Sequence, residues 1–194
     1  AVTHAAIRAS SKPSRSSIRQ ILKTGRIAPP NFRLGSVMVL NLAPALFMIR
    51  YRIETEPGLF ITLKHRKRNG FLPLRSRPDV WLFIPENDTL LEWEKTAAAC
   101  PEDSDLFCLE LRGTGETVPA TIDFQPIERA EYRYAVAGYD LGKPYLGGRV
   151  RDILATVKLL KKHGAKTITL IGNGKSSLPV WLAGFLKNLP TKNS

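Results

Sequence analysis

Three short runs rich in apolar residues recur between residues 80 and 171, with helix-like segments between them. The runs lie at 80–84, 105–111 and 167–171. Apolar runs of this length, bounded by prolines, glycines or charges, are typical of strands buried on both faces of a parallel sheet. Because helices connect successive parallel strands, this alternation predicts an α/β fold, with a mostly parallel sheet and helices on both of its faces.

The clearest helical pattern covers 149–163, where Val150, Ile153 and Val157 recur at helical spacing and Gly164 ends the pattern. Further helices are expected at 89–100, at 128–141 and from 176 or 177 to 186. In front of these elements, 46–55 alternates like a strand and 59–65 returns after a Pro-Gly turn. This pattern predicts an antiparallel hairpin that joins one edge of the sheet.

Basic residues are concentrated in the first part of the chain. The formal net charge is +12, and 1–26 contains six Lys or Arg and no acid. We expect 1–30 to be a basic, disordered arm, with one or two helical turns around 17–23. The run at 64–70 adds a basic hairpin tip. Such charge attracts anionic polymers, or it only keeps a surface soluble, and the sequence leaves both interpretations open.

Composition excludes several other classes of protein. No run approaches the ~18 apolar residues that a membrane span needs. Cys100 and Cys108 are too few for a disulfide framework, although a single bridge between them stays open. No metal site and no cofactor are predicted. The chain begins with Ala and ends just after a helix, so we expect a piece of a longer protein, and neither terminus indicates a compartment.

The strand at 167–171 runs directly into a glycine turn and then a helix. The five turn residues are Gly172, Asn173, Gly174, Lys175 and Ser176. They match the small flanking positions of a Gly-x-Ser-x-Gly nucleophile elbow, but Gly174 stands where the serine belongs. Ser176 is the only plausible substitute nucleophile, and at the start of a helix it is more typically a cap.

The same residues match the end of a phosphate-binding loop, Gly-x-x-x-x-Gly-Lys-Ser. Thr169 stands at the position of the first glycine, and the segment between strand and Gly174 is too short to wrap a phosphate chain. A nucleotide binder is therefore a weak alternative.

Four segments together resemble a known family. They are YRIETEPG at 51–58, LRGTGET at 111–117, GKPYLGGRVRDIL at 142–154 and ITLIGNGKS at 168–176. In this order they resemble acetyl xylan esterase-like and prolyl oligopeptidase-like domains of the α/β-hydrolase superfamily. The resemblance covers roughly 50–186 and implies that 46–194 is an incomplete α/β-hydrolase domain, truncated after the nucleophile elbow.

The resemblance implies acyl-transfer chemistry by Ser, Asp or Glu, and His, in that chain order. This sequence departs from it, because Gly174 replaces the serine and His4, His65 and His163 all precede the turn. The segment 85–88 also lacks the His-Gly type of turn that donates oxyanion N–H groups. We therefore expect a carboxylesterase-like protein that is inactive as this chain.

Several alternatives remain open from the sequence. A longer parent could hydrolyse an ester, an acylated carbohydrate or a peptide through Ser176, or the chain could be a non-catalytic module for an anionic partner. Arg112 either contacts a substrate or forms an ion pair with Asp152, and His163 is expected at a helix end. A truncated sheet would leave 167–171 as an exposed edge, which predicts self-association.

Overall fold

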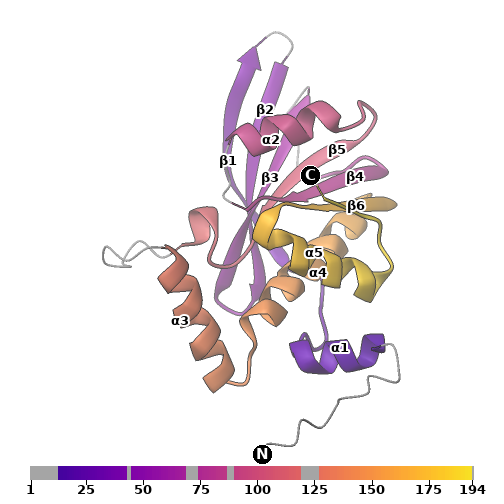
Figure 1. Ribbon diagram of the computed structural model, residues 1–194. Coiled ribbons are helices and arrows are strands. Elements are labelled where there is room, and N and C mark those ends of the chain that lie inside the picture. The colour runs from indigo at the N-terminus through magenta and orange to yellow at the C-terminus, as the bar shows by residue number, and fades with distance from the viewer. Residues whose placement is uncertain (1–12, 43–44, 69–73, 87–89, 119–126, 194) are drawn as a thin grey trace, which may run out of the picture.

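One seven-stranded sheet organises the part of the chain that this computed structural model describes, residues 13–42, 45–68, 74–86, 90–118 and 127–193 (Figure 1). The strand order is β1-β2-β3-β5-β4-β6-β7. The strands are β1 Asn31–Leu42, β2 Ala45–Glu56, β3 Leu59–Arg68, β4 Asp79–Ile84, β5 Asp105–Glu110, β6 Thr167–Gly172 and β7 Thr191–Asn193. Strands β4 to β7 run parallel, and β1 to β3 are antiparallel to their neighbours. The predicted α/β fold with an N-terminal antiparallel hairpin is confirmed.

Alternate residues of the central strands enter two separate apolar cores, because successive side chains of a strand point to opposite faces. Val80, Leu82 and Ile84 of β4 pack in the larger core with the buried stripe of helix α4 (Tyr145–Lys162). Phe83 of the same strand packs in a smaller core with Trp93 of helix α2 (Leu90–Ala99). The sheet is therefore covered on both faces, as the sequence predicted.

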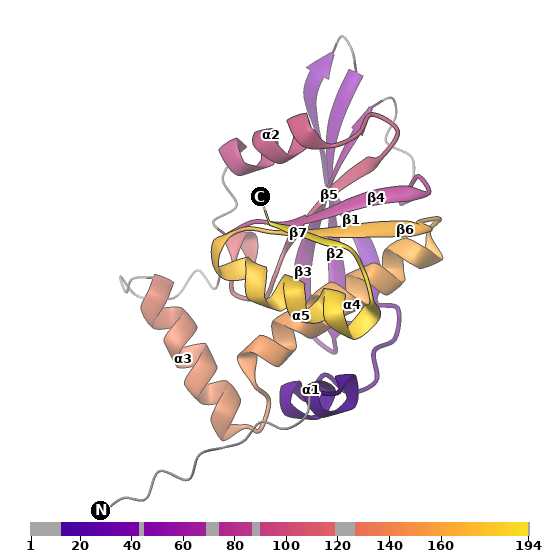
Figure 2. The same cartoon turned by 45° about the vertical axis from the view of Figure 1, so that its right-hand side comes forward.

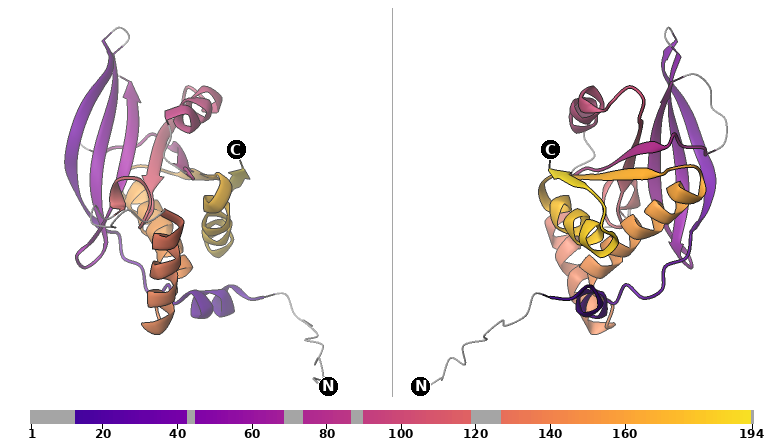
Figure 3. Two further views of the ribbon diagram at one scale, coloured as in Figure 1. Left: turned by 60° about the vertical axis from the view of Figure 1, so that its left-hand side comes forward. Right: turned by 90° about the vertical axis from the view of Figure 1, so that its right-hand side faces the viewer.

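The helices divide between those faces. They are α1 Arg15–Leu22, α2 Leu90–Ala99, α3 Ile127–Asp140, α4 Tyr145–Lys162 and α5 Ser177–Lys187. Helices α4 and α5 cover one face and α2 the other, while α1 lies outside α4 and α5 (Figures 1 and 2). Helix α3 stands away from the sheet, beside the start of α4 (Figure 3). None of the described helices is long and apolar enough to cross a membrane.

Helix α4 begins at Tyr145, four residues before the start that the sequence predicts. Its first turn contains Gly147 and Gly148, which resemble a loop in sequence. A Cβ atom at Gly147 would lie 1.8 Å from the carbonyl oxygen of Leu22. The glycine is there because α1 packs directly against the backbone of α4, a contact between segments that no local pattern reveals.

The basic arm expected at 1–30 is ordered over much of its second half. Helix α1 forms at the predicted position, and its first turn is capped by the Ser14 hydroxyl, which accepts from the Ser17 amide at 3.1 Å. Leu22 is buried, and Arg151 of α4 donates to the carbonyl of Thr24 at 2.8 Å. For these residues the prediction of disorder was wrong, because tertiary contacts hold them. Residues 1–12 lie outside the described ones.

The predicted exposed edge at 167–171 was wrong in part. Strand β7 pairs with β6 over Leu170–Gly172, so among the described residues only 167–169 of β6 have no neighbouring strand on that side. The long edge belongs instead to β1, a strand that was not predicted from the sequence and that leaves Leu34 60% exposed and Val39 50% exposed. The open question of a disulfide is answered too, since Cys100 and Cys108 are both free thiols.

Candidate active site

A sharp turn follows β6 at the carboxyl edge of the parallel strands. A 3-10 turn over Gly174–Ser176 leads directly into α5, and the amide of Ser176 donates to the carbonyl of Asn173 at 2.9 Å. A Cβ at Gly172 would lie 2.9 Å from Val180 Cγ2 and 3.0 Å from Ser177 Cα. Glycine at 172 thus allows the strand and the returning helix to approach closely, as a nucleophile elbow requires.

The central position of the turn has no side chain, and a carboxylate fills the space where one would project. Gly174 has a φ of +49°, the left-handed region that side-chain-bearing residues rarely adopt. A Cβ built there would lie 1.9 Å from Glu86 Oε2 and 2.3 Å from its Cδ. Glu86 follows the adjacent strand β4, and its own amide donates to Glu92 Oε2 at 3.2 Å. The sequence contains no signal for this placement of Glu86.

Ser176 is buried, with 4% of its surface exposed. Its hydroxyl donates to the carbonyl oxygen of Pro85 at 2.8 Å, which ties the turn to the end of β4. Ser176 occupies the N-cap position of α5, yet its side chain makes no capping hydrogen bond. The Ser176 hydroxyl, predicted as the substitute nucleophile, thus donates its hydrogen bond to a backbone carbonyl inside the protein.

Lys175 is exposed and lies beside α3. Its ammonium lies 4.0 Å from Glu131 Oε2, and Glu131 Oε1 accepts from Arg149 Nη2 at 2.6 Å. The lysine of the phosphate-loop-like sequence is therefore beside a carboxylate. Only Asn173 separates β6 from the 3-10 turn, so the described backbone forms no loop around a phosphate.

The two described histidines lie away from this turn. His65 is buried beside Asp105 at the amino end of β5, with 3.6 Å between Nε2 and Oδ1, and it stacks on Phe107 at 4.0 Å between ring centroids. His163 follows the last turn of α4, as expected for a helix end, and its ring packs edge-on against Phe32 at 5.0 Å. Neither packs against the turn at 172–176.

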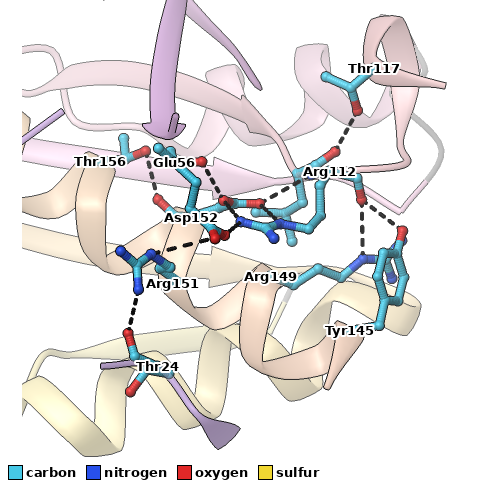
Figure 4. A network of polar contacts seen from close by, with 11 residues as sticks. Thr24, Glu56, Arg112, Thr117, Tyr145, Arg149, Arg151, Asp152 and Thr156 are labelled. Carbon is cyan, nitrogen blue, oxygen red and sulfur yellow. Dashed lines mark hydrogen bonds and ion pairs between the residues drawn. The ribbon is translucent and has the colours of Figure 1, made fainter. Parts of the chain in front are cut away.

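Arg112, the residue proposed for the substrate side, forms a two-pronged ion pair with Asp152 (Figure 4). Its Nε donates to Asp152 Oδ2 at 2.9 Å, and its Nη2 donates to Asp152 Oδ1 at 2.7 Å and to Glu56 Oε1 at 2.6 Å. Burial alone would lower the pKa of Arg112, but these two carboxylates outweigh it and hold that pKa above its ordinary value. The ion pair predicted as one alternative is present.

The loop after Arg112 is held against the start of α4. Tyr145 Oη donates to the carbonyl of Arg112 at 2.8 Å, and Arg149 Nη2 donates to Tyr145 Oη at 3.1 Å (Figure 4). Gly113 has a φ of +70°, and a Cβ there would lie 2.1 Å from Tyr145 Oη. The Arg-Gly pair is therefore explained by packing: the arginine joins β2, β5 and α4, and the glycine admits the tyrosine.

Three solved esterase structures share this arrangement of strands and helices. The chain superposes on a protein assigned as an acetyl xylan esterase from Bacteroides fragilis with a TM-score of 0.64 and 13% identity, over 89% of this chain and 48% of that one. The fold is that of an α/β-hydrolase.

Two acetyl xylan esterases share the same fold. The enzyme from Thermoanaerobacterium sp. matches with a TM-score of 0.60 and 10% identity, over 94% of this chain and 58% of that one. The enzyme from Paenibacillus sp. R4 matches with a TM-score of 0.58 and 10% identity, over 91% and 55%. The chain thus spans about half the length of these structures. No protein-family model and no curated protein matches it.

Proposed function

We propose that this chain is an esterase-like α/β-hydrolase domain that does not hydrolyse esters by itself. The observation that carries the proposal is the turn after β6, where Gly174 offers no nucleophile and the Glu86 carboxylate occupies the space of the missing side chain. Acyl transfer by a serine needs a hydroxyl that is open to the substrate and bonded to a base. Gly174 has no hydroxyl, and the Ser176 hydroxyl donates a hydrogen bond to the carbonyl of Pro85.

The charge around the turn also opposes this chemistry. A tetrahedral intermediate carries a negative oxygen, which esterases stabilise with preorganised hydrogen-bond donors. Here the Glu86 carboxylate lies over Gly174, and a second carboxylate, Glu131, lies near Lys175. Repulsion from Glu86 would raise the energy of an oxyanion formed at this place, so the turn disfavours the transition state as well as lacking the nucleophile.

The alternative is a hydrolase that becomes active within a longer parent, using Ser176 on an ester or an acylated carbohydrate. The names of the matched structures suggest acetyl esters of xylan as the substrate class for such a parent. This alternative requires that Ser176 turns away from Pro85 and that a base arrives from outside the described residues.

Labelling of this chain and of a longer parent with a fluorophosphonate, followed by peptide mass spectrometry, distinguishes the two, because the alternative predicts an adduct at Ser176 in the parent and our proposal predicts none in either. We expect no adduct at Ser176, and no difference between the chain and its Ser176→Ala variant in turnover of p-nitrophenyl acetate. An adduct at Ser176 that is absent in the variant would refute the proposal. The double variant Gly174→Ser/Glu86→Ala tests whether Glu86 fills the space of the missing side chain. Removing the carboxylate should make room for the introduced serine. In a parent that supplies the base, the fluorophosphonate should then label this new hydroxyl.

One feature favours a second function, the binding of an anionic partner. A cavity of about 370 Å³ at the amino end of β4 and β5 is lined by four cationic side chains, Arg66, Lys67, Arg75 and Arg77. Its acidic lining residues are Glu102 and Asp105. A Lys67→Gln/Arg75→Gln variant should elute from heparin at lower salt than the matched Lys161→Gln/Lys162→Gln variant of α4. Elution of the two variants at equal salt would refute this second function.

A further inference from the structure

A second hollow lies on the far side of Arg112, away from the turn after β6. It has a volume of about 480 Å³ and is enclosed by the end of α1, the β2–β3 turn, α3 and the start of α4. Its apolar lining includes Leu22, Leu59, Phe60, Tyr134, Leu141 and Pro144. Among the described residues that line it, none belongs to 172–176. Volume and apolar lining are those of a small-molecule pocket.

Glycines form part of the wall of this hollow, at places where neighbouring segments pack closely. Four of its lining residues are glycines, namely Gly113, Gly138, Gly147 and Gly148. Two large apolar side chains around it remain open to solvent, with Phe60 46% exposed and Leu141 74% exposed. The rings of Tyr134 and Tyr145 stack at 5.9 Å between centroids beside it. Exposed apolar surface gathered around one concavity is a feature of ligand sites.

Positive charge gathers at the rim. Lys23, Lys143 and Arg151 line the hollow, and the acid that faces them, Glu56, already accepts from Arg112 at 2.6 Å. Neither lysine has an ion-pair partner in the described part of the chain. Arg151 donates from Nη1 to the carbonyl of Thr24, while its Nε, 3.9 Å from Glu56, is buried without a hydrogen bond there.

The two lysines line the hollow from two segments that pack against each other. Gly147 packs directly on the carbonyl of Leu22, and Lys23 is the next residue after Leu22. Lys143 precedes Gly147 by four residues, in the segment that enters α4. One ligand head group can therefore approach both ammonium groups while its body enters the apolar hollow.

From this arrangement we propose that the hollow binds a small amphipathic carboxylate. The apolar or aromatic body packs between Phe60, Tyr134 and Leu141, and the carboxylate pairs with Lys23 and Lys143. Arg112 shapes the floor through its own ion pairs and does not contact the ligand. The proposal is independent of whether the turn at Gly174 is catalytic, because the ligand is bound and not transformed.

Titration with 2-naphthoate tests the proposal, with the neutral 2-naphthamide and the cationic 2-naphthylmethylammonium as matched probes. For a ligand of this size we expect a Kd on the order of 1 mM or tighter, measured by NMR chemical shifts of the ¹⁵N-labelled chain. The amide signals of Gly113, Gly138 and Gly148 should move. The carboxylate should bind roughly two- to fivefold more tightly than the amide, and the cation least.

Two variants separate the roles of charge and volume. Lys143→Gln should weaken binding of 2-naphthoate by roughly two- to fivefold and leave 2-naphthamide unchanged. Ala137→Phe, which places a ring into the hollow from α3, should weaken both probes about tenfold or more. Lys161→Gln on α4 and Ala98→Phe on α2 are the matched controls outside the lining, and neither should change either affinity.

Three results would overturn the proposal. They are the absence of saturable binding, equal or tighter binding of the cation, and shifts that lie outside the hollow or survive Ala137→Phe unchanged. Folding of each variant is checked by its unperturbed NMR spectrum away from the substitution, so loss of binding in an unfolded variant is not counted as support.

Discussion

Replacing Asp152 by alanine removes the buried carboxylate that joins α4 to β2 and to the loop after β5. Asp152 is fully buried and accepts four hydrogen bonds: two from the Arg112 guanidinium, at 2.9 and 2.7 Å, one from the Arg112 amide at 3.2 Å and one from the Thr55 hydroxyl at 2.7 Å. The substitution removes this acceptor from the Arg112 Nε, the Arg112 amide and the Thr55 hydroxyl, and it leaves the Arg112 Nη2 and its charge with Glu56 alone.

Removing one partner of a buried ion pair costs about 3–5 kcal/mol. Because Glu56 still accepts from Arg112 and 16% of the Arg112 side chain is exposed, we expect the lower end, about 3 kcal/mol. Urea unfolding followed by circular dichroism measures the loss as a lower midpoint at an unchanged denaturant slope. Asp140→Ala, an exposed acid at the end of α3, is the control and should change the free energy of unfolding by less than about 0.5 kcal/mol.

A double variant separates the lost charge pair from lost packing. Arg112→Met/Asp152→Ala removes both charges, so its cost should be well below the sum of the two single costs. The reasoning is refuted if Asp152→Ala costs less than about 1 kcal/mol, which is the range of exposed pairs. It is refuted as well if the double variant loses the full sum.

Two further perturbations test the packing of α1 and the burial of His65. Gly147→Ala should release α1 from α4, because its Cβ would lie 1.8 Å from the Leu22 carbonyl oxygen. Limited proteolysis should therefore cut α1 faster in this variant than in a Lys161→Ala control at an exposed position of α4. Equal cutting of the two would contradict this. Burial lowers the pKa of His65, an effect that Asp105 only partly offsets, so the unfolded chain binds a proton more readily. Stability should therefore be full above a pH of about 6.5 and fall below it, and His65→Phe should flatten that slope between pH 7 and 5, whereas an unchanged slope would show that other groups cause it.

The central strands could be predicted because their environment leaves a local trace. β4, β5 and β6 are buried on both faces, so apolar residues predominate in β4 and β5 and recur in β6 at Ile168, Leu170 and Ile171, and each run is visible without knowledge of its neighbours. The helix over 149–163 is visible for a similar reason, since one stripe of it faces the sheet.

Strand β1 was not predicted, because its apolar run at 37–40 covers only a third of it. It lies at the sheet edge, where neither alternation nor a continuous apolar run is required, and its pairing with β2 is interrupted by bulges near Gly35 and Leu40. Its existence depends on β2, a partner strand, and not on its own pattern. The order of α1 over 15–22 likewise depends on the close approach of Leu22 to Gly147.

The sequence by itself determined the α/β order, the sharp turn after β6 and the absence of a serine side chain at Gly174, because each depends on residue type or on near neighbours in the chain. Only the tertiary structure decided that Glu86 fills the space over Gly174, that Ser176 donates to Pro85, and that Arg112 pairs with Asp152 and Glu56. Those contacts join residues that lie far apart in the sequence, and they form only when the strands and helices pack together in the folded chain.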